Sequence, residues 1–175
     1  MTVAAIYTCA GHQLTDDERA FFKDADPFGF ILFGDNIDTP DQIRALTASL
    51  RETVGRDDAP ILIDQEGGRV ARLTPPQWRS APPAKSFGDL ALRDMEAARR
   101  AAEINARLIA SELYDLGIDV DCAPVLDLSI PGAHDVIGDR SFGGNPDLVI
   151  AVGRAFADGL MAGGVMPIIK HVPGH

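Results

Sequence analysis

The sequence predicts an α/β fold built on a parallel sheet, and three observations support this prediction. Short apolar runs alternate along the chain with longer segments whose apolar residues recur at helical spacing. Capping residues and glycines mark the ends of the helical segments. Charged residues stand at the ends of several apolar runs. The resulting order, β-α-β-α-β-α-β-α-β, is typical of parallel strands joined by crossover helices.

The first half of the chain holds three predicted strands and two predicted helices. The strands are the apolar runs Val3–Thr8, Gly29–Phe33 and Pro60–Asp64. Thr15, with Glu18 three residues later, forms a capping box that begins the first helix. Thr39 is the expected N-cap of the second helix, and Gly55 ends it. These local signals place one helix between each pair of successive strands.

The second half begins with a long loop and a strong helix. Residues 65–89 are rich in Pro and Gly, and loops of this length inside a compact domain are often functional. The helix is expected over about residues 93–116, with Gly117 at its end. Its expected apolar face consists of Ala97, Ala101, Ile104, Leu108 and Ile109. The remaining predicted elements are a strand over Ile118–Leu128, an irregular loop over 129–144, a helix from Asn145 to about Met161 and a strand over Val165–His171.

Two architectures fit this order: a doubly wound open sheet, or part of a (β/α)8 barrel. Asp64, Asp127 and the pair Lys170–His171 each lie where an apolar run ends. In a barrel these strand ends converge on one rim, which holds the active site. A doubly wound nucleotide binder would show a G-x-G-x-x-G turn after its first strand, whereas this chain reads TCAGHQL there. The sequence therefore favours the N-terminal part of a barrel, with about five βα units.

Composition excludes several classes of function. The chain of 175 residues is 46% hydrophobic and 24% charged, which is ordinary globular usage and disfavours disorder. Its net charge of -10 argues against binding to nucleic acid or to an anionic membrane surface. The N-terminus has no basic signal-peptide region, and no apolar stretch approaches the ~20 residues that span a bilayer. We therefore expect a cytoplasmic protein with neither a nucleic-acid nor a membrane partner.

The cysteines and histidines do not indicate a metal site. Cys9 and Cys122 both lie in apolar runs and are expected to be free thiols rather than a disulfide framework. His171 and His175 are four residues apart, the spacing of a zinc pair on a helix. The intervening Pro-Gly pair disfavours a helix there, so we expect no metal.

The segment DQEGGRVARL, residues 64–73, is the most informative stretch. A strand end delivers Asp64, Gly67 and Gly68 allow a tight turn, and Arg69 and Arg72 follow within reach. An ionised carboxylate beside a guanidinium accepts hydrogen bonds, which suits sugar hydroxyls. A structural Asp–Arg pair that holds the loop is an equally good interpretation of these residues alone.

Two other stretches place charged residues in loops. Asp139 and Arg140 lie in a glycine-rich loop before a helix, where a helix-entry motif with a surface salt bridge is the simpler interpretation. Phosphate binding at that helix is disfavoured, because Pro146 removes a donor and Asp147 adds negative charge. Lys170 and His171 form a donor pair that suits sugar hydroxyls or a carboxylate.

Taken together, these stretches resemble glycoside hydrolase family three, and most closely its NagZ-like branch of bacterial β-N-acetylglucosaminidases. The motifs GFILFGDNI, ILIDQEGGRVARL, LGIDVDCAPVLDL, VIGDRSFGGNP and IIKHVPGH occur in the order and spacing of that family. The resemblance implies a (β/α)8 barrel that removes non-reducing terminal N-acetylglucosamine with retention and without a cofactor. It also implies an oligosaccharide or muropeptide substrate in cell-wall recycling. The residues that it places against the hydroxyls of the terminal sugar are Asp64, Arg72, Arg140, Lys170 and His171.

The resemblance also implies where the chemistry is done. Retaining hydrolysis needs a nucleophile and an acid/base group. In this branch the acid/base is a histidine paired with an aspartate, just after the KHxPGH motif, and the nucleophile is a later aspartate. Both would lie beyond His175, so residues 1–175 are expected to be a partial barrel domain, truncated after KHVPGH and inactive alone. The alternatives are a non-catalytic sugar-binding fragment, β-glucosidase specificity, and a nucleotide- or phosphate-dependent α/β enzyme.

Overall fold

The computed structural model describes residues 1–132 and 134–175; residue 133, in the predicted loop 129–144, lies outside the described residues. The first six elements are β1 (Val3–Tyr7), α1 (Asp16–Ala25), β2 (Pro27–Leu32), η1 (Gly34–Asn36), α2 (Pro40–Val54) and β3 (Ile61–Ile63). They are followed by α3 (Ala84–Ala91), α4 (Met95–Asp115), β4 (Val120–Asp121), η2 (Gly138–Arg140), α5 (Pro146–Ala162) and β5 (Met166–Pro167).

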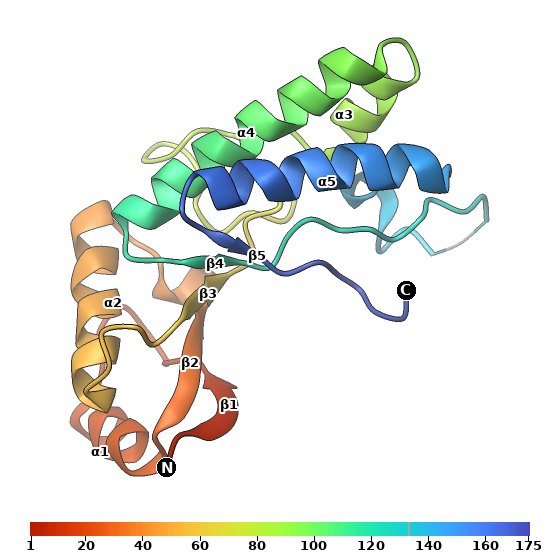
Figure 1. Cartoon of the computed structure of the whole chain (residues 1–175). Coiled ribbons are helices and arrows are strands. Elements are labelled where there is room, and N and C mark those ends of the chain that lie inside the picture. Colours follow the sequence, from red (N-terminus) through yellow and green to blue (C-terminus); the bar gives the residue numbers. More distant parts are fainter. Residues whose placement is uncertain (133) are drawn as a thin grey trace.

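The strands form one parallel sheet in the order β1-β2-β3-β4-β5. Figure 1 shows α1 and α2 beside the early strands and α4 and α5 over the late strands, all on the same side of a bent sheet. A doubly wound sheet reverses its strand order at a switch point and carries helices on both faces. The consecutive order therefore confirms the predicted α/β barrel-type fold and disfavours the doubly wound alternative.

The helix ends follow the local signals of the sequence. Thr15 Oγ1 accepts a hydrogen bond from Glu18 N at 3.2 Å, and the Glu18 carboxylate accepts one from Thr15 N at 2.8 Å. Thr39 Oγ1 caps α2 by accepting a hydrogen bond from Gln42 N at 3.3 Å, and Gly55 ends that helix with a left-handed φ of 64°. These capping predictions are confirmed because each depends on residues only a few positions apart.

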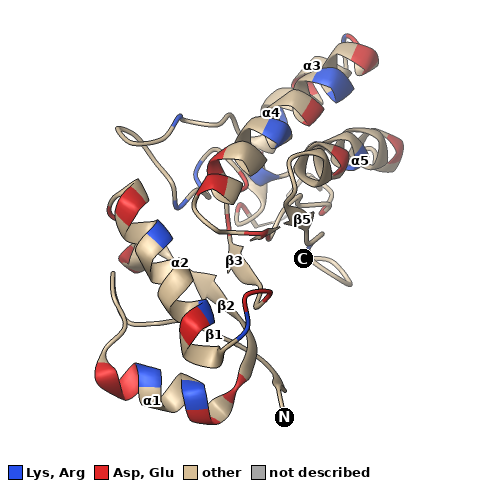
Figure 2. Ribbon diagram, turned by 60° about the vertical axis from the view of Figure 1, so that its left-hand side comes forward, with Lys and Arg blue, Asp and Glu red and all other residues tan. Residues whose placement is uncertain are grey.

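The core lies between the sheet and the helices. Phe30, Leu32, Ile61 and Ile63 of the central strands have no exposed surface. Acidic and basic residues are interspersed along α1, α2 and α4, as the ribbon in Figure 2 shows. Within residues 1–132 and 134–175, no helix combines the length and apolar composition that a bilayer crossing requires.

One helix lies where only a loop was expected. The sequence AKSFGDLA forms α3, which begins inside the predicted loop 65–89 and ends two residues after it. Gly88 weakens the helical signal of this segment, but a Cβ at that position would lie 1.6 Å from the Phe142 carbonyl oxygen. The glycine thus serves a close contact between α3 and the segment before α5, which no local pattern reveals.

The predicted apolar face of α4 is wrong for two of its three large members, while Ile109 is buried as predicted. Ile104 and Leu108 are exposed, at 54% and 49%. The residues that α4 buries are Ala98, Ala102, Asn105, Ala106, Ile109, Ala110 and Leu113. A Cβ at Gly159 of α5 would lie 2.3 Å from the Glu103 carbonyl oxygen, so the two helices approach closely. Close approach favours the alanine-rich face of α4, and Ile104 and Leu108 lie outside it.

Candidate functional site

Three charged residues meet at the carboxyl ends of the strands. Asp64 directly follows β3, and its Oδ1 accepts a hydrogen bond from Lys170 Nζ at 2.7 Å. Its Oδ2 accepts one from Arg72 Nη2 at 3.1 Å. Lys170 lies beyond β5, where an isolated parallel bridge to Val125 extends the sheet pairing. The sheet therefore brings together side chains that are 106 residues apart in the chain.

These contacts keep Asp64 ionised. Burial alone raises the pKa of Asp64, but the hydrogen bonds and charges of Lys170 and Arg72 outweigh it and leave the pKa below its ordinary value. The Arg72 guanidinium also lies 5.7 Å from the centre of the Phe33 ring, at the end of β2. Asp64 is thus a partly buried anion with fixed cationic partners.

Glu66 links Arg140 to the contacts of Asp64, because its carboxylate contacts both Arg140 and Lys170. Its buried carboxylate accepts hydrogen bonds from Arg140 Nε and Nη2, both at 2.8 Å, and lies 2.6 Å from Lys170 Nζ. The bond to Glu66 raises the pKa of Arg140. Burial lowers the pKa of Lys170, but its bonds to Asp64 and Glu66 outweigh this and raise it. Both bases therefore stay charged at neutral pH.

Asp127 holds the chain after β5. Its Oδ2 lies 2.5 Å from His171 Nδ1 and accepts a bond from His171 N at 3.2 Å. Its Oδ1 accepts a bond from His175 N at 2.8 Å. Burial raises the pKa of Asp127, but these bonds, first that to the His171 ring, outweigh it and lower the pKa. Asp127 therefore orients the imidazole of His171 through Nδ1.

Residues 3–175 match the family described as the glycosyl hydrolase family 3 N terminal domain. The chain belongs to this family. It is 41% identical over 170 residues to a beta-hexosaminidase of Methylococcus capsulatus, covering 97% of this chain and 49% of that protein. It therefore spans about half the length of this curated relative.

Two solved structures are also similar to this family 3 chain in fold and sequence. NagZ from Neisseria gonorrhoeae, in complex with N-trifluoroacetyl-D-glucosamine, superimposes with a TM-score of 0.91 at 36% identity, covering 98% of this chain and 50% of that one. A glycoside hydrolase family 3 beta-N-acetylglucosaminidase from Paenibacillus sp. superimposes with a TM-score of 0.86 at 34% identity, covering 97% and 32%.

The family 3 chain brings all five predicted site residues to one edge of the sheet. Arg72 and Lys170 each contact Asp64, and Arg140 is linked to Lys170 through Glu66. His171 follows Lys170 and pairs with Asp127 instead. Whether the five bind a sugar stays a prediction.

Two sequence interpretations need correction. Arg69 was expected within reach of Asp64, but it pairs with Asp139 at 2.8 Å, and both side chains are substantially exposed. The surface-salt-bridge interpretation therefore holds for Asp139 and is wrong for Arg140, whose side chain is only 13% exposed. The two arginines follow different partners because Arg140 reaches inward to Glu66 while Arg69 stays at the surface.

Glu66 is the main residue that the sequence interpretation missed. One signal was available, because residues two apart along an extended chain point to the same side. Glu66 lies two positions after Asp64, so the pattern D-x-E placed two carboxylates on one side of the strand end. No local signal identified their partners, which come from beyond β5 and from the 138–140 turn.

Two titratable groups lie beneath the charged cluster. Burial raises the pKa of Asp121 well above its ordinary value, and its Oδ1 accepts a bond from Gln65 N at 3.0 Å. The charged groups in contact with one another are the carboxylates of Asp64 and Glu66 and the cations of Lys170, Arg72 and Arg140. Cys122 is free and only partly buried, and burial, followed by the charge of Asp64, raises the pKa of its thiol to about 11. It is therefore a poor nucleophile at neutral pH.

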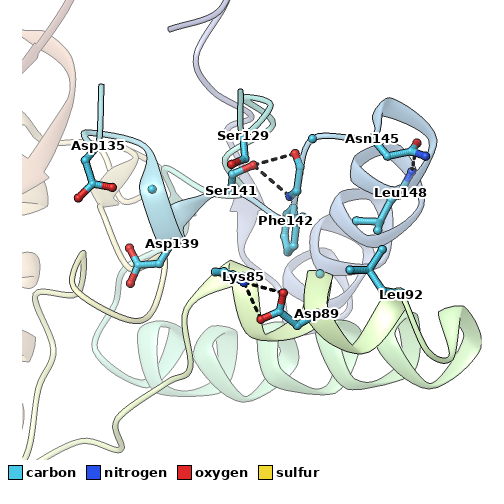
Figure 3. Close-up of a pocket in the computed structure, with 14 residues that line it drawn as sticks. Lys85, Asp89, Leu92, Ser129, Asp135, Asp139, Ser141, Phe142, Asn145 and Leu148 are labelled. Carbon is cyan, nitrogen blue, oxygen red and sulfur yellow. Dashed lines mark hydrogen bonds and ion pairs between the residues drawn. The ribbon is translucent and has the colours of Figure 1, made fainter. Parts of the chain in front are cut away.

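Cavities help to locate the site. One of about 360 Å³ lies beside Asp127, Lys170 and His171. Another, of about 470 Å³, lies between α3 and the start of α5 and contains none of the five predicted residues. Figure 3 shows the ion pair of Lys85 with Asp89 in this cavity, and Asp135 and Asp139 with no partner among the residues drawn. The 360 Å³ cavity is lined by two of the five predicted residues, Lys170 and His171, and Lys170 links it to Asp64. We therefore place the candidate site at the edge of the sheet where this cavity meets the Asp64 contacts. Among the described residues, no group of three or more His, Cys, Asp or Glu could hold a metal ion.

Proposed function

We propose that the whole protein carrying this chain is a β-N-acetylhexosaminidase that removes terminal N-acetylglucosamine from β-linked substrates with retention. The observation that carries the proposal is the ionised Asp64 held between Lys170 and Arg72 at the carboxyl edge of the sheet. Membership of family 3 and the names of the relatives support the reaction class.

The proposed work of these residues is to bind and orient the sugar. Each oxygen of Asp64 receives one cation and keeps a lone pair that can accept a bond from a sugar hydroxyl. Arg72, Arg140, Lys170 and His171 are the proposed donors. Hydrogen bonds to charged partners are stronger than neutral ones, so a sugar bound here is held in a defined orientation. The nucleophile and the acid/base group of retaining hydrolysis are not assigned to any of these residues.

The reaction is tested with the whole protein on two chromogenic substrates. We expect release of nitrophenol from 4-nitrophenyl N-acetyl-β-D-glucosaminide to be much faster than from the β-D-glucoside. NMR of the first-formed anomer should show the β configuration. Preference for the glucoside, or an α product, would contradict the proposal.

The binding role is tested by calorimetry with N-acetylglucosamine. Asp64→Asn should raise the Kd at least about tenfold, because hydrogen bonds to a charged group contribute roughly 1.5–3 kcal/mol. Asp89→Asn, which removes the partner of Lys85 on α3, is the matched control and should bind as the parent does. Equal affinities for all three proteins would exclude Asp64 from the site.

The finer substrate assignment is supported by the family resemblance alone. We propose that the substrate is a muropeptide carrying N-acetylglucosamine linked to anhydro-N-acetylmuramic acid, processed in the cytoplasm during cell-wall recycling. A comparison of kcat/KM on this disaccharide and on chitobiose tests the assignment. A preference for chitobiose would favour a general oligosaccharide substrate.

A further inference from the structure

Gln65 lies between Asp64 and Glu66 in the sequence, but its side chain contacts neither the carboxylates nor the cations of the candidate site. Its side chain is buried, with the residue 1% exposed. Its Oε1 accepts hydrogen bonds from Arg72 N at 2.8 Å and Leu73 N at 3.0 Å, and its Nε2 donates to Leu73 O at 2.9 Å. The side-chain amide of Gln65 therefore makes its hydrogen bonds to the backbone of Arg72 and Leu73.

The backbone of Gln65 is itself held by β4. Gln65 N donates to Asp121 Oδ1 at 3.0 Å. One step earlier in the ladder, Cys122 N donates to Ile63 O at 2.8 Å. The hydrogen bonds between β3 and β4 thus end with a side chain: after the backbone bond at Ile63, the Asp121 carboxyl accepts the bond from Gln65 N. This contact fixes Gln65 to the sheet.

Arg72 depends on this anchor. Within residues 1–132 and 134–175, the bond to Gln65 is the one that holds the Arg72 backbone. Its guanidinium donates to Asp64 Oδ2, while its buried Nε has no hydrogen-bond partner in the same described part of the chain. The turn between them contains Gly67, with a φ of 93°, and Gly68, with a φ of 59°, which add backbone freedom. A displaced backbone at Arg72 would therefore displace its guanidinium from Asp64.

We propose that Gln65 is a positioning residue of the candidate site, which holds Arg72 against Asp64 and thereby sets the affinity for a sugar. Its burial keeps it from touching the ligand, so its effect passes through Arg72. The inference rests on the proposed function for the ligand, but the contact that it describes exists in the free protein.

A double-mutant cycle in the whole protein tests the inference, with N-acetylglucosamine as the probe in calorimetry. We expect Gln65→Ala to raise the Kd about tenfold, because a hydrogen bond to a charged group is misaligned. Arg72→Ala should raise it by at least as much. In the Arg72→Ala background, Gln65→Ala should add less than about twofold, because residues acting through one another are not additive. If the increase in Kd of the double variant equals the product of the two single increases, or if Gln65→Ala keeps the parental Kd, the inference is overturned.

Two further variants separate positioning from general stability. Gln42→Ala removes another amide that bonds to loop backbone, at His12 O and Asn36 O, and should lower the melting temperature while leaving the Kd unchanged. Gln65→Met fills the same space without the hydrogen bonds, so it serves if the alanine variant does not fold. It should weaken binding as Gln65→Ala does, and a parental Kd in a folded Gln65→Met would contradict positioning.

A ligand-free measurement distinguishes failure of this inference from failure of the proposed function. In proteins labelled with 15N-arginine, the Arg72 side-chain resonance, identified by its loss in Arg72→Ala, should move toward that of free arginine in Gln65→Met. If the parent binds no N-acetylglucosamine, the proposed function fails, and this shift still supports the positioning of Arg72. An unchanged resonance would overturn the inference whatever the protein binds.

Discussion

The Glu66 carboxylate receives both Nε and Nη2 of Arg140, at 2.8 Å each, across 74 residues of sequence. The same carboxylate lies 2.6 Å from Lys170 Nζ. The side chains of Glu66, Arg140 and Lys170 are 6%, 13% and 14% exposed, so solvent screens these charges weakly. Glu66 therefore fixes two cations that approach the site from different segments.

Replacing Glu66 should destabilise the fold strongly. Glu66→Gln keeps the shape but leaves two poorly hydrated cations without their shared anion, and we expect a loss of about 3 kcal/mol. Urea denaturation at neutral pH measures the change. Asp139→Asn is the matched control, because its pair with Arg69 is exposed and should contribute about 1 kcal/mol or less. Equal losses for the two variants would mean that the Glu66 cluster is not a buried network.

Acid should weaken the fold through Asp64. Its pKa is lower in the folded chain, so its contribution is fully present above the ordinary Asp pKa of about 3.9 and is lost as pH falls through the lowered folded value. Asp64→Asn should therefore flatten the acid limb of a plot of unfolding free energy against pH. Urea titrations between pH 2 and pH 7 measure this, and parallel acid limbs for parent and variant would contradict it.

Asp121 should act in the opposite direction. Its pKa is raised by burial, so the folded state keeps a proton that the unfolded state loses, and stability falls as pH rises above the ordinary Asp pKa. Asp121→Asn mimics the protonated acid and keeps the acceptor for Gln65 N. The variant should gain stability over the parent with rising pH, by at most about 1.4 kcal/mol per pH unit. A difference that stays constant from pH 3 to pH 8 would show that Asp121 is not protonated in the fold.

The contact of α3 with the segment before α5 should be sensitive to one methyl group. A Cβ at Gly88 would lie 1.6 Å from Phe142 O, so Gly88→Ala should cost about 3 kcal/mol despite the better helix propensity of Ala. Gly11→Ala is the control, because a Cβ there meets no atom within 4 Å. Thermal melts of both variants measure the difference. A melting temperature for Gly88→Ala equal to that of Gly11→Ala would contradict the close contact.

The positions of the site residues were more predictable than their contacts. Asp64 and Lys170 were readable from the sequence because each follows an apolar run, and parallel strands end at a common edge. Their partners were not. Arg69 is nearer to Asp64 in sequence than Arg72 is, yet only Arg72 reaches it, because Arg69 pairs with Asp139 from a distant loop.

The sequence by itself determined the local features of this protein. The helix caps at Thr15 and Thr39 depend on residues within one helical turn, and the alternation of apolar runs with helices depends on short segments. The local sequence alone therefore specifies them. Tertiary structure alone decided the buried face of α4, the helix at 84–91 and the shared anion Glu66. Each of these depends on close approach or charge pairing between segments distant along the chain, and only the folded sheet brings those segments together.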